Sequence, residues 1–155
     1  MTAAAASPQS GAIEGGLHSL PVRVYYEDTD FTGVVYYANY LKFMERGRTD
    51  FLRCAGVAHA ALAELDPPLG FAIREANLKF HAPARIDDAL IVETWLVDAR
   101  GARLRMEQRI LRDETLLVEG SVEAACIDFA GRPRRLPATV SEQIIRHARS
   151  VLKSS

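Results

Sequence analysis

The chain has 155 residues, of which 48% are hydrophobic and 25% charged, and its net charge is −1. A chain of this length and composition can form one globular domain with a sizeable core. The balanced charge argues against a general affinity for nucleic acid. No apolar run approaches the roughly 18 residues that a spanning helix needs, so no membrane span is expected.

Residues 1–18 are rich in Ala, Ser and Gly and contain few large apolar side chains. We therefore expect a disordered N-terminal tail, followed by a single domain over residues 19–153. The first residues combine neither a basic stretch nor an apolar run, so no secretory signal is expected. Cys54 and Cys126 lie in apolar segments, which is typical of buried thiols in a reducing compartment, so we expect a cytoplasmic protein.

The pattern of apolar residues predicts a strand at residues 20–27 and then a helix at residues 38–55. In the helix, apolar residues recur at three- and four-residue steps, and Gly56 suits its end. Four predicted strands follow, joined by short turns, at residues 70–82, 89–97, 103–111 and 116–127. Residues 137–152 predict a second helix, with Thr139 and Glu142 spaced as a capping box.

Consecutive strands joined by short turns form an antiparallel sheet. A long helix with an apolar stripe needs an apolar surface to cover, and this sheet is the one available. We therefore predict an α+β fold in which an antiparallel β-sheet wraps around a long central α-helix.

The segment VYYEDTDFTGVVYYANY, residues 24–40, places Glu27, Asp28 and Asp30 between an apolar strand and the predicted helix. Desolvating carboxylates is costly, so their clustering here indicates that the charge is used. An EF-hand calcium loop does not fit. Counted from Asp28, its twelfth position holds Asn39 instead of Glu, and a strand precedes the loop where a helix should be.

A phosphatase of the haloacid dehalogenase type matches the motif better, because Asp28, Asp30 and Thr32 fit D-x-D-x-T after an apolar strand. That fold, however, is a parallel sheet with a helix after nearly every strand. Residues 70–127 contain no predicted helix, so the architecture argues against this alternative.

The segment YYEDTDFTGVVYYANYLKFMERGRTDFLR resembles the signature region of the hotdog-fold acyl-CoA thioesterases of the 4-hydroxybenzoyl-CoA thioesterase family. It is most similar to the branch called the Tol-Pal-associated acyl-CoA thioesterases, although Tyr37 stands where that branch commonly has His. The resemblance covers about residues 20–136 and includes FAGRPRRLP after the last predicted strand. It implies the hotdog fold, hydrolysis of an acyl-CoA, a catalytic Asp30, and active sites at the interface of a homodimer or homotetramer.

Thioester hydrolysis requires an attacking oxygen and stabilisation of the charge that develops on the carbonyl oxygen. Asp30 can attack directly or activate water as a general base, and the sequence leaves both routes open. The backbone N–H of Tyr37, at the start of the predicted helix, can donate to the carbonyl oxygen. Gly33 would let the backbone pass close to the thioester, and Asp28 most simply orients the loop.

The predicted substrate-binding residues come from this loop and from a basic turn near the C-terminus. They are Gly33, Val34, Val35, Tyr36 and Asn39 in the loop, and Arg132, Arg134 and Arg135 in the turn. The arginines could bind the phosphates of coenzyme A or dock an acyl carrier protein. No metal or other cofactor is expected, because no two histidines have ligand-like spacing with a carboxylate.

Two other functions stay open. A hydratase or dehydratase of acyl thioesters on the same fold would normally use a histidine as general base, and no histidine accompanies the Asp30 segment. A non-catalytic subunit that binds acyl thioesters or serves as a scaffold would bind the same ligand without turnover.

Overall fold

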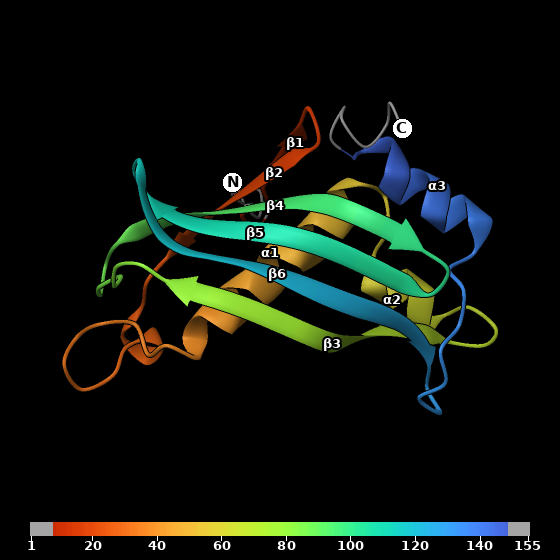
Figure 1. Ribbon diagram of the computed structural model, residues 1–155, viewed down its shortest axis with the longest axis horizontal. Helices are drawn as coiled ribbons and strands as arrows, with labels where there is room; N and C mark the ends of the chain where they lie inside the picture. Colours follow the sequence, from red (N-terminus) through yellow and green to blue (C-terminus); the bar gives the residue numbers. More distant parts are fainter. Residues whose placement is uncertain (1–7, 149–155) are drawn as a thin grey trace, which may run out of the picture.

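Six antiparallel strands form one sheet in the order β1-β2-β4-β5-β6-β3 in the computed structural model, which describes residues 8–148 (Figure 1). The strands are β1 (Ala12–Glu14), β2 (Leu17–Arg23), β3 (Leu69–Phe80), β4 (Ala89–Arg100), β5 (Arg103–Arg112) and β6 (Thr115–Asp128). The helices are the 3-10 helix η1 (Tyr26–Asp28) and the α-helices α1 (Asn39–Cys54), α2 (His59–Ala63) and α3 (Ala138–Arg146). The predicted α+β fold, with an antiparallel sheet wrapped around a long helix, is confirmed.

Helix α1 crosses behind the sheet in Figure 1 and buries one face against it. Phe43, Met44 and Phe51 on that face are all 0% exposed, and burial of side chains of this size stabilises the fold by about 1.5–3 kcal/mol each. Gly47 allows the helix to approach β4 closely. A Cβ atom at this position would lie only 2.8 Å from Cγ1 of Val92.

A buried polar contact crosses the middle of the core. Gln108 on β5 is 1% exposed, and its side-chain amide donates to the Met44 carbonyl at 2.8 Å and to Oγ1 of Thr94 at 2.9 Å. The Oε1 atom of the same side chain accepts a hydrogen bond of 3.0 Å from Arg48. The buried apolar side chains form two clusters, one around Tyr40 and Phe43 and the other around Phe51 and Leu52.

The expected tail over residues 1–18 is wrong for residues 8–18. β1 and β2 pair antiparallel, and Gly15 and Gly16 between them have positive φ angles of 59° and 84°. A two-residue hairpin turn with both φ angles positive favours glycine, so this Gly-Gly pair is the sequence feature that indicates the hairpin. His18 on β2 is fully buried. Residues 1–7 and the expected domain end at residue 153 lie outside the described residues.

Several element boundaries also differ. The strand expected at residues 20–27 ends at Arg23 and is followed by η1. The five-residue helix α2 was not predicted, because a single turn of mostly alanine has no apolar periodicity. Helix α3 begins after Pro137 without a side-chain cap, so the expected capping box is absent. The helix at residues 38–55 and the four later strands are confirmed within a few residues.

Within residues 8–148, none of the helices is long and apolar enough to cross a membrane.

Candidate active site

Asp28 anchors the loop that precedes α1. It is 6% exposed, and its carboxylate accepts hydrogen bonds of 2.8 Å from the backbone N–H of Tyr25 and from the side-chain amide of Asn39. Its carbonyl oxygen accepts a third bond, of 3.0 Å, from the N–H of Tyr36. With these partners, Asp28 orients the segment of residues 29–36, called here the Asp30 loop.

Asp30 lies within this loop and is partly exposed. Its Oδ1 atom accepts from the hydroxyl of Thr32 at 2.6 Å and from the N–H of Thr32 at 2.8 Å. These two hydrogen bonds hold the pKa of Asp30 below its ordinary value. The group is therefore a carboxylate at neutral pH, and the backbone N–H of Val34 also lowers its pKa.

The turn within the loop depends on Gly33. The N–H of Asp30 donates to the Val34 carbonyl at 2.9 Å, and the N–H of Gly33 donates to the Asp30 carbonyl at 3.2 Å. Gly33 has a φ of 85°, which L-residues rarely adopt, while a Cβ added there would meet nothing within 4 Å. The backbone conformation, and not the space around it, therefore requires glycine here.

The backbone N–H of Tyr37 lies directly between the Asp30 loop and α1. The neighbouring N–H of Asn39 donates to the Tyr36 carbonyl at 2.8 Å, and that of Leu41 donates to the Ala38 carbonyl at 3.2 Å. The N–H of Tyr37 has no acceptor among residues 8–148. Tyr37 precedes the N-cap residue Ala38 of this 16-residue helix, close to its positive end, and its role as a donor to substrate stays a prediction.

Two residues predicted to bind substrate have structural partners instead. Val35 is 4% exposed, packs in the core and donates its N–H to the Ala84 carbonyl at 2.8 Å. Asn39 is 7% exposed, and its amide is bound to Asp28. Both residues position the loop and offer little surface to a ligand. Val34 and Gly33 are partly exposed, and Tyr36 is half exposed.

Exposed aromatic side chains surround the Asp30 loop, a clustering that was not predicted from the sequence. The rings of Tyr37 and Phe80 lie 6.3 Å apart, so the end of β3 joins this surface. Clustered exposed apolar groups mark sites where a ligand or another chain binds. The exposed aromatic residues of this surface are Tyr25, Tyr26, Phe31, Tyr36, Tyr37 and Phe80.

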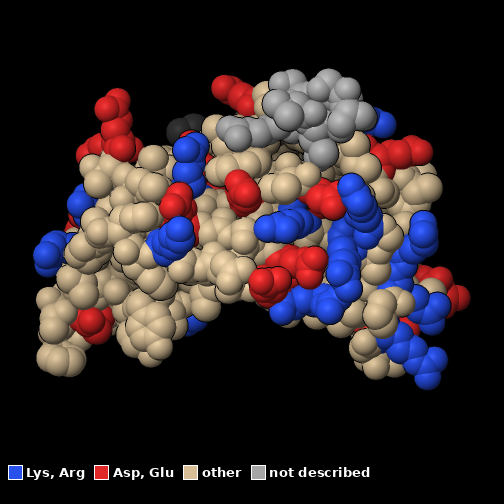
Figure 2. Space-filling view, in the orientation of Figure 1, with Lys and Arg blue, Asp and Glu red and all other residues tan. Residues whose placement is uncertain are grey.

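The three predicted arginines lie at the other end of the sheet, in the turn of residues 129–135, called here the arginine turn (Figure 1). Asp128 holds this turn, because its carboxylate accepts from Nε of Arg134 at 2.9 Å and from the N–H of Arg132 at 3.0 Å. The side chains of Arg132 and Arg135 are exposed, and basic side chains gather over this end of the molecule in Figure 2. One chain alone therefore does not bring the arginines to Asp30.

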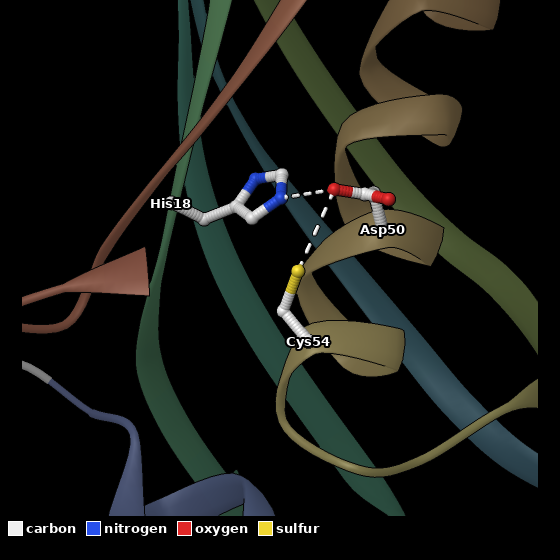
Figure 3. Close-up of side chains that lie close together, drawn as sticks. All are labelled: His18, Asp50 and Cys54. Carbon is white, nitrogen blue, oxygen red and sulfur yellow. Dashed lines mark hydrogen bonds and ion pairs between the residues drawn. The ribbon is translucent and has the colours of Figure 1, made fainter. Parts of the chain in front are cut away.

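A second polar cluster, away from the loop, joins the β1–β2 hairpin to α1 (Figure 3). His18 donates from Nε2 to Oδ2 of Asp50 at 2.7 Å, and the thiol of Cys54 lies 3.6 Å from the same oxygen. The N–H of Gly11 and the hydroxyl of Ser10 also donate to Asp50, at 2.7 Å and 2.9 Å. The sequence contains no local signal for this cluster, because His18 ends a segment whose composition is typical of a disordered tail.

The electrostatics of this cluster indicate a structural role. Burial alone would raise the pKa of Asp50, but the hydrogen bonds from His18, Gly11 and Ser10 outweigh it and lower the pKa. Burial and the charge of Asp50 raise the pKa of Cys54, which therefore remains a thiol. His18, Asp50 and Cys54 are close enough to hold a metal ion. However, Nε2 and Oδ2 already bind each other and the thiol is protonated, so we assign the cluster to hairpin anchoring.

The family model of the Thioesterase-like superfamily matches residues 24–144, which contain the Asp30 loop, α1 and the whole of β3 to β6. The chain belongs to this family. Two thioesterase-like relatives are an acyl-CoA thioesterase YbgC from Haemophilus influenzae and an acyl-CoA thioester hydrolase YbgC from Escherichia coli O6:H1. The first is 43% identical over 111 residues, covering 72% of this chain and 81% of the relative. The second is 43% identical over 122 residues, covering 77% of this chain and 90% of the relative.

Solved structures of the thioesterase-like family have the same fold. A probable thioesterase from Bartonella henselae is 46% identical, with a TM-score of 0.76, over 78% of this chain and 99% of that one. A 4-hydroxybenzoyl-CoA thioesterase in complex with 4-hydroxybenzoyl-CoA is 19% identical, with a TM-score of 0.77, and this likeness concerns the fold alone. The family resemblance and the hotdog fold predicted from the sequence are confirmed.

Proposed function

We propose that this chain hydrolyses the thioester of an acyl-coenzyme A to a free acid and coenzyme A. The observation that carries the proposal is the pairing of an ionised, partly exposed Asp30 with the N–H of Tyr37, which follows its loop and has no acceptor among residues 8–148. Both stand in a chain that belongs to the thioesterase-like family and is 43% identical to acyl-CoA thioester hydrolases.

The two groups divide the chemistry between them. Asp30 supplies the attacking oxygen, either by bonding to the thioester carbon or by taking a proton from a water molecule that attacks it. In both routes negative charge develops on the carbonyl oxygen, where the N–H of Tyr37 and the N-terminus of α1 stabilise it. The carbon–sulfur bond then breaks. Coenzyme A leaves as a thiolate, which takes up a proton. In the direct route, water finally hydrolyses the anhydride at Asp30.

The proposed active unit is a homodimer, or a homotetramer built from such dimers, joined at β3. This 12-residue strand is an edge of the sheet, and Ile73 and Phe80 on it are 50% and 51% exposed. A long exposed edge invites pairing with another strand. Pairing with a second copy about a two-fold axis makes the two strands antiparallel, so the Phe80 end of one copy lies beside the Leu69 end of the other.

This arrangement supports the proposed role of the arginine turn. Leu69 pairs with Asp128, so the turn adjoins the start of β3, whereas Phe80 adjoins Tyr37 at the end of β3. In the antiparallel pair, the arginine turn of one copy reaches the side of the Asp30 loop of the other. Coenzyme A phosphates, or an acyl carrier protein, would bind there. The free thiols of Cys54 and Cys126 fit a cytoplasmic location.

The test measures the turnover of a panel of acyl-CoA substrates with a dye that detects the released thiol. Asp30→Asn keeps the side-chain volume and removes its basicity, so we expect a loss of about 10²–10⁴-fold in kcat. Asp113→Asn is the matched control, because Asp113 is exposed in the β5–β6 turn with a φ of 54° that Asn tolerates. A near-native rate of Asp30→Asn contradicts the proposal, and binding without turnover by the wild type indicates a scaffold subunit.

A further inference from the structure

Tyr40, on the first turn of α1, is linked to the Asp30 loop through one residue. It is 3% exposed, and its hydroxyl oxygen accepts a hydrogen bond of 3.0 Å from the backbone N–H of Ala84. The carbonyl of Ala84 accepts a bond of 2.8 Å from the N–H of Val35 in the loop. Burial raises the pKa of Tyr40, so the side chain stays a neutral phenol. This buried hydroxyl therefore acts on the loop through Ala84.

The support segment, a name used here for residues 83–88, runs beside the Asp30 loop. Val34 in the loop and Arg85 in the segment form an antiparallel bridge. The N–H of Ile86 donates to the Gly33 carbonyl at 3.3 Å. Loop and segment therefore form a short two-stranded ribbon, so a shift of the segment also moves the loop.

An ion pair holds the support segment on a second side. Nη1 of Arg112 on β5 donates to Oδ2 of Asp88 at 2.8 Å and to the Pro83 carbonyl at 3.2 Å. The same Asp88 oxygen accepts from the N–H of Arg85 at 2.9 Å. The side chains of Arg112 and Asp88 are 33% and 23% exposed, so solvent screens their attraction only in part. The segment is thus fixed to β5 by this ion pair and to α1 by Tyr40.

The Asp30 loop is therefore tied to the start of α1 on both sides of Asp30. Asn39 bonds Asp28, which lies before Asp30 in the chain. Tyr40, the next residue of the helix, holds Val35 after Asp30 through the support segment. Side chains of consecutive helix residues point about 100° apart, which lets the two residues reach both sides of the loop.

We propose that Tyr40 and Arg112 are positioning residues for thioester hydrolysis and that they act through the support segment. The inference rests on the proposed function and adds residues that act on the loop and not on the substrate. Asp30 and the N–H of Tyr37 must flank one carbonyl group. A displaced loop separates the attacking oxygen from the donor that stabilises the developing charge, and a misplacement of about 1 Å can cost about 100-fold in rate.

The first experiment compares Tyr40→Phe with Thr94→Val. Tyr40→Phe keeps the ring and leaves the N–H of Ala84 without its acceptor. Thr94→Val deletes another fully buried hydroxyl, which accepts from Gln108 at 2.9 Å in the middle of the core. Both variants should have a lower urea midpoint, since each deprives a buried donor of an acceptor. Only Tyr40→Phe should lower kcat for butyryl-CoA, by about 10- to 100-fold, with little change in KM.

The second experiment measures amide hydrogen exchange by NMR, which does not depend on activity. In Tyr40→Phe, the amides of Ala84 and Val35 should exchange about tenfold faster or more, because the support segment is released from α1. Amides in the centre of β5 should exchange as in the wild type. In Thr94→Val, the amides of Ala84 and Val35 should keep their wild-type rates.

The third experiment tests the tie to β5. Arg112→Met removes both hydrogen bonds to the support segment and should lower kcat about tenfold or more. Arg112→Lys keeps a charged donor beside Asp88 and should recover much of that loss. Arg105→Met, at an exposed position of the same strand, is the matched control. If Tyr40→Phe does not fold, Arg112→Met and Arg112→Lys replace it in the kinetic and exchange measurements.

Different results separate this inference from the proposed function. A native kcat in Tyr40→Phe or in Arg112→Met overturns the positioning role of that residue, while thioester hydrolysis by the wild type stands. An equal loss of kcat in Thr94→Val also overturns the inference, because the loss would then reflect a loosened core. A wild type that hydrolyses no acyl-CoA overturns the proposed function. The exchange rates of Ala84 and Val35 then still decide whether Tyr40 holds the loop.

Discussion

The side-chain amide of Asn39 donates a hydrogen bond of 2.8 Å to Oδ1 of Asp28, and both residues are buried. Asn39 is the first residue of α1, so this bond fixes the Asp30 loop to the helix whose N-terminus faces the proposed reaction. Asp28 and Asp30 are only two residues apart, yet their environments are opposite. Asp28 is buried among donors and holds the loop in place, whereas Asp30 is partly exposed.

Replacing Asn39 with Ala tests this coupling. The change leaves a buried oxygen of Asp28 without its donor, which should lower the free energy of unfolding by about 1–3 kcal/mol. The loop would also lose its register with α1, so we expect kcat to fall about 10- to 100-fold. Urea unfolding and kcat for a butyryl-CoA substrate measure the two effects. A variant with native stability and rate would show that the bond is dispensable.

The hydrogen bonds of Thr32 set the acid limb of the pH profile. Its hydroxyl and N–H hold the pKa of Asp30 below 3.8, so the active carboxylate form persists as the pH falls towards 4. Thr32→Val removes the hydroxyl bond and keeps the backbone bond, which should raise the pKa of Asp30. The acid limb of log kcat/KM would then move to higher pH, while Thr32→Ser would leave it in place. An unmoved limb in Thr32→Val argues against Asp30 as the titrating group.

Local patterns predicted α1 and the four later strands, because their apolar periodicity and short turns lie within the segment itself. The hairpin of β1 and β2 escaped prediction because its support is distant. His18 is held by Asp50, which is 32 residues away, and Gly15 and Gly16 look like tail composition without that contact. At the site, the motif singled out Asp30 and Tyr37, whose catalytic roles stay predictions. The buried contact of Asp28 with Asn39 depends on packing that no short segment contains.

Asp50 should make the stability of the fold pH-dependent. Its pKa is lowered in the folded state, so its contribution is present above the unfolded value near 3.8 and is lost as the pH falls through the folded pKa. At neutral pH, Asp50→Asn should lower the free energy of unfolding by about 1–3 kcal/mol.

The difference between wild type and Asp50→Asn should shrink when urea unfolding is repeated at decreasing pH, since the wild-type carboxyl is then also neutral. Asp98→Asn is the control, because Asp98 pairs with Arg100 at the surface and should change stability by less than about 0.5 kcal/mol. If the difference in free energy of unfolding stays constant down to the lowest pH, the contribution of Asp50 does not come from its charge.

The last prediction concerns the arginine turn and follows from how its three arginines differ. Arg134 is bound to Asp128 at 2.9 Å and helps to hold the turn, so replacing it would disturb the backbone. Arg132 and Arg135 are exposed, and their side chains have no ion-pair partner among residues 8–148. These two are the charges that can bind phosphate groups.

We therefore expect Arg132→Gln combined with Arg135→Gln to raise KM for butyryl-CoA with little change in kcat. Contacts with coenzyme A phosphates are remote from the breaking bond, so they bind the substrate and the transition state about equally. The dependence of KM on salt should flatten, since fewer charges remain to be screened. A truncated thioester without the nucleotide should show no difference from wild type. Arg146→Gln, an exposed position on α3, controls for the loss of surface charge. An unchanged KM for the full substrate would show that the arginine turn does not bind coenzyme A. A loss of activity confined to substrates carried by acyl carrier protein would show that the turn binds that protein.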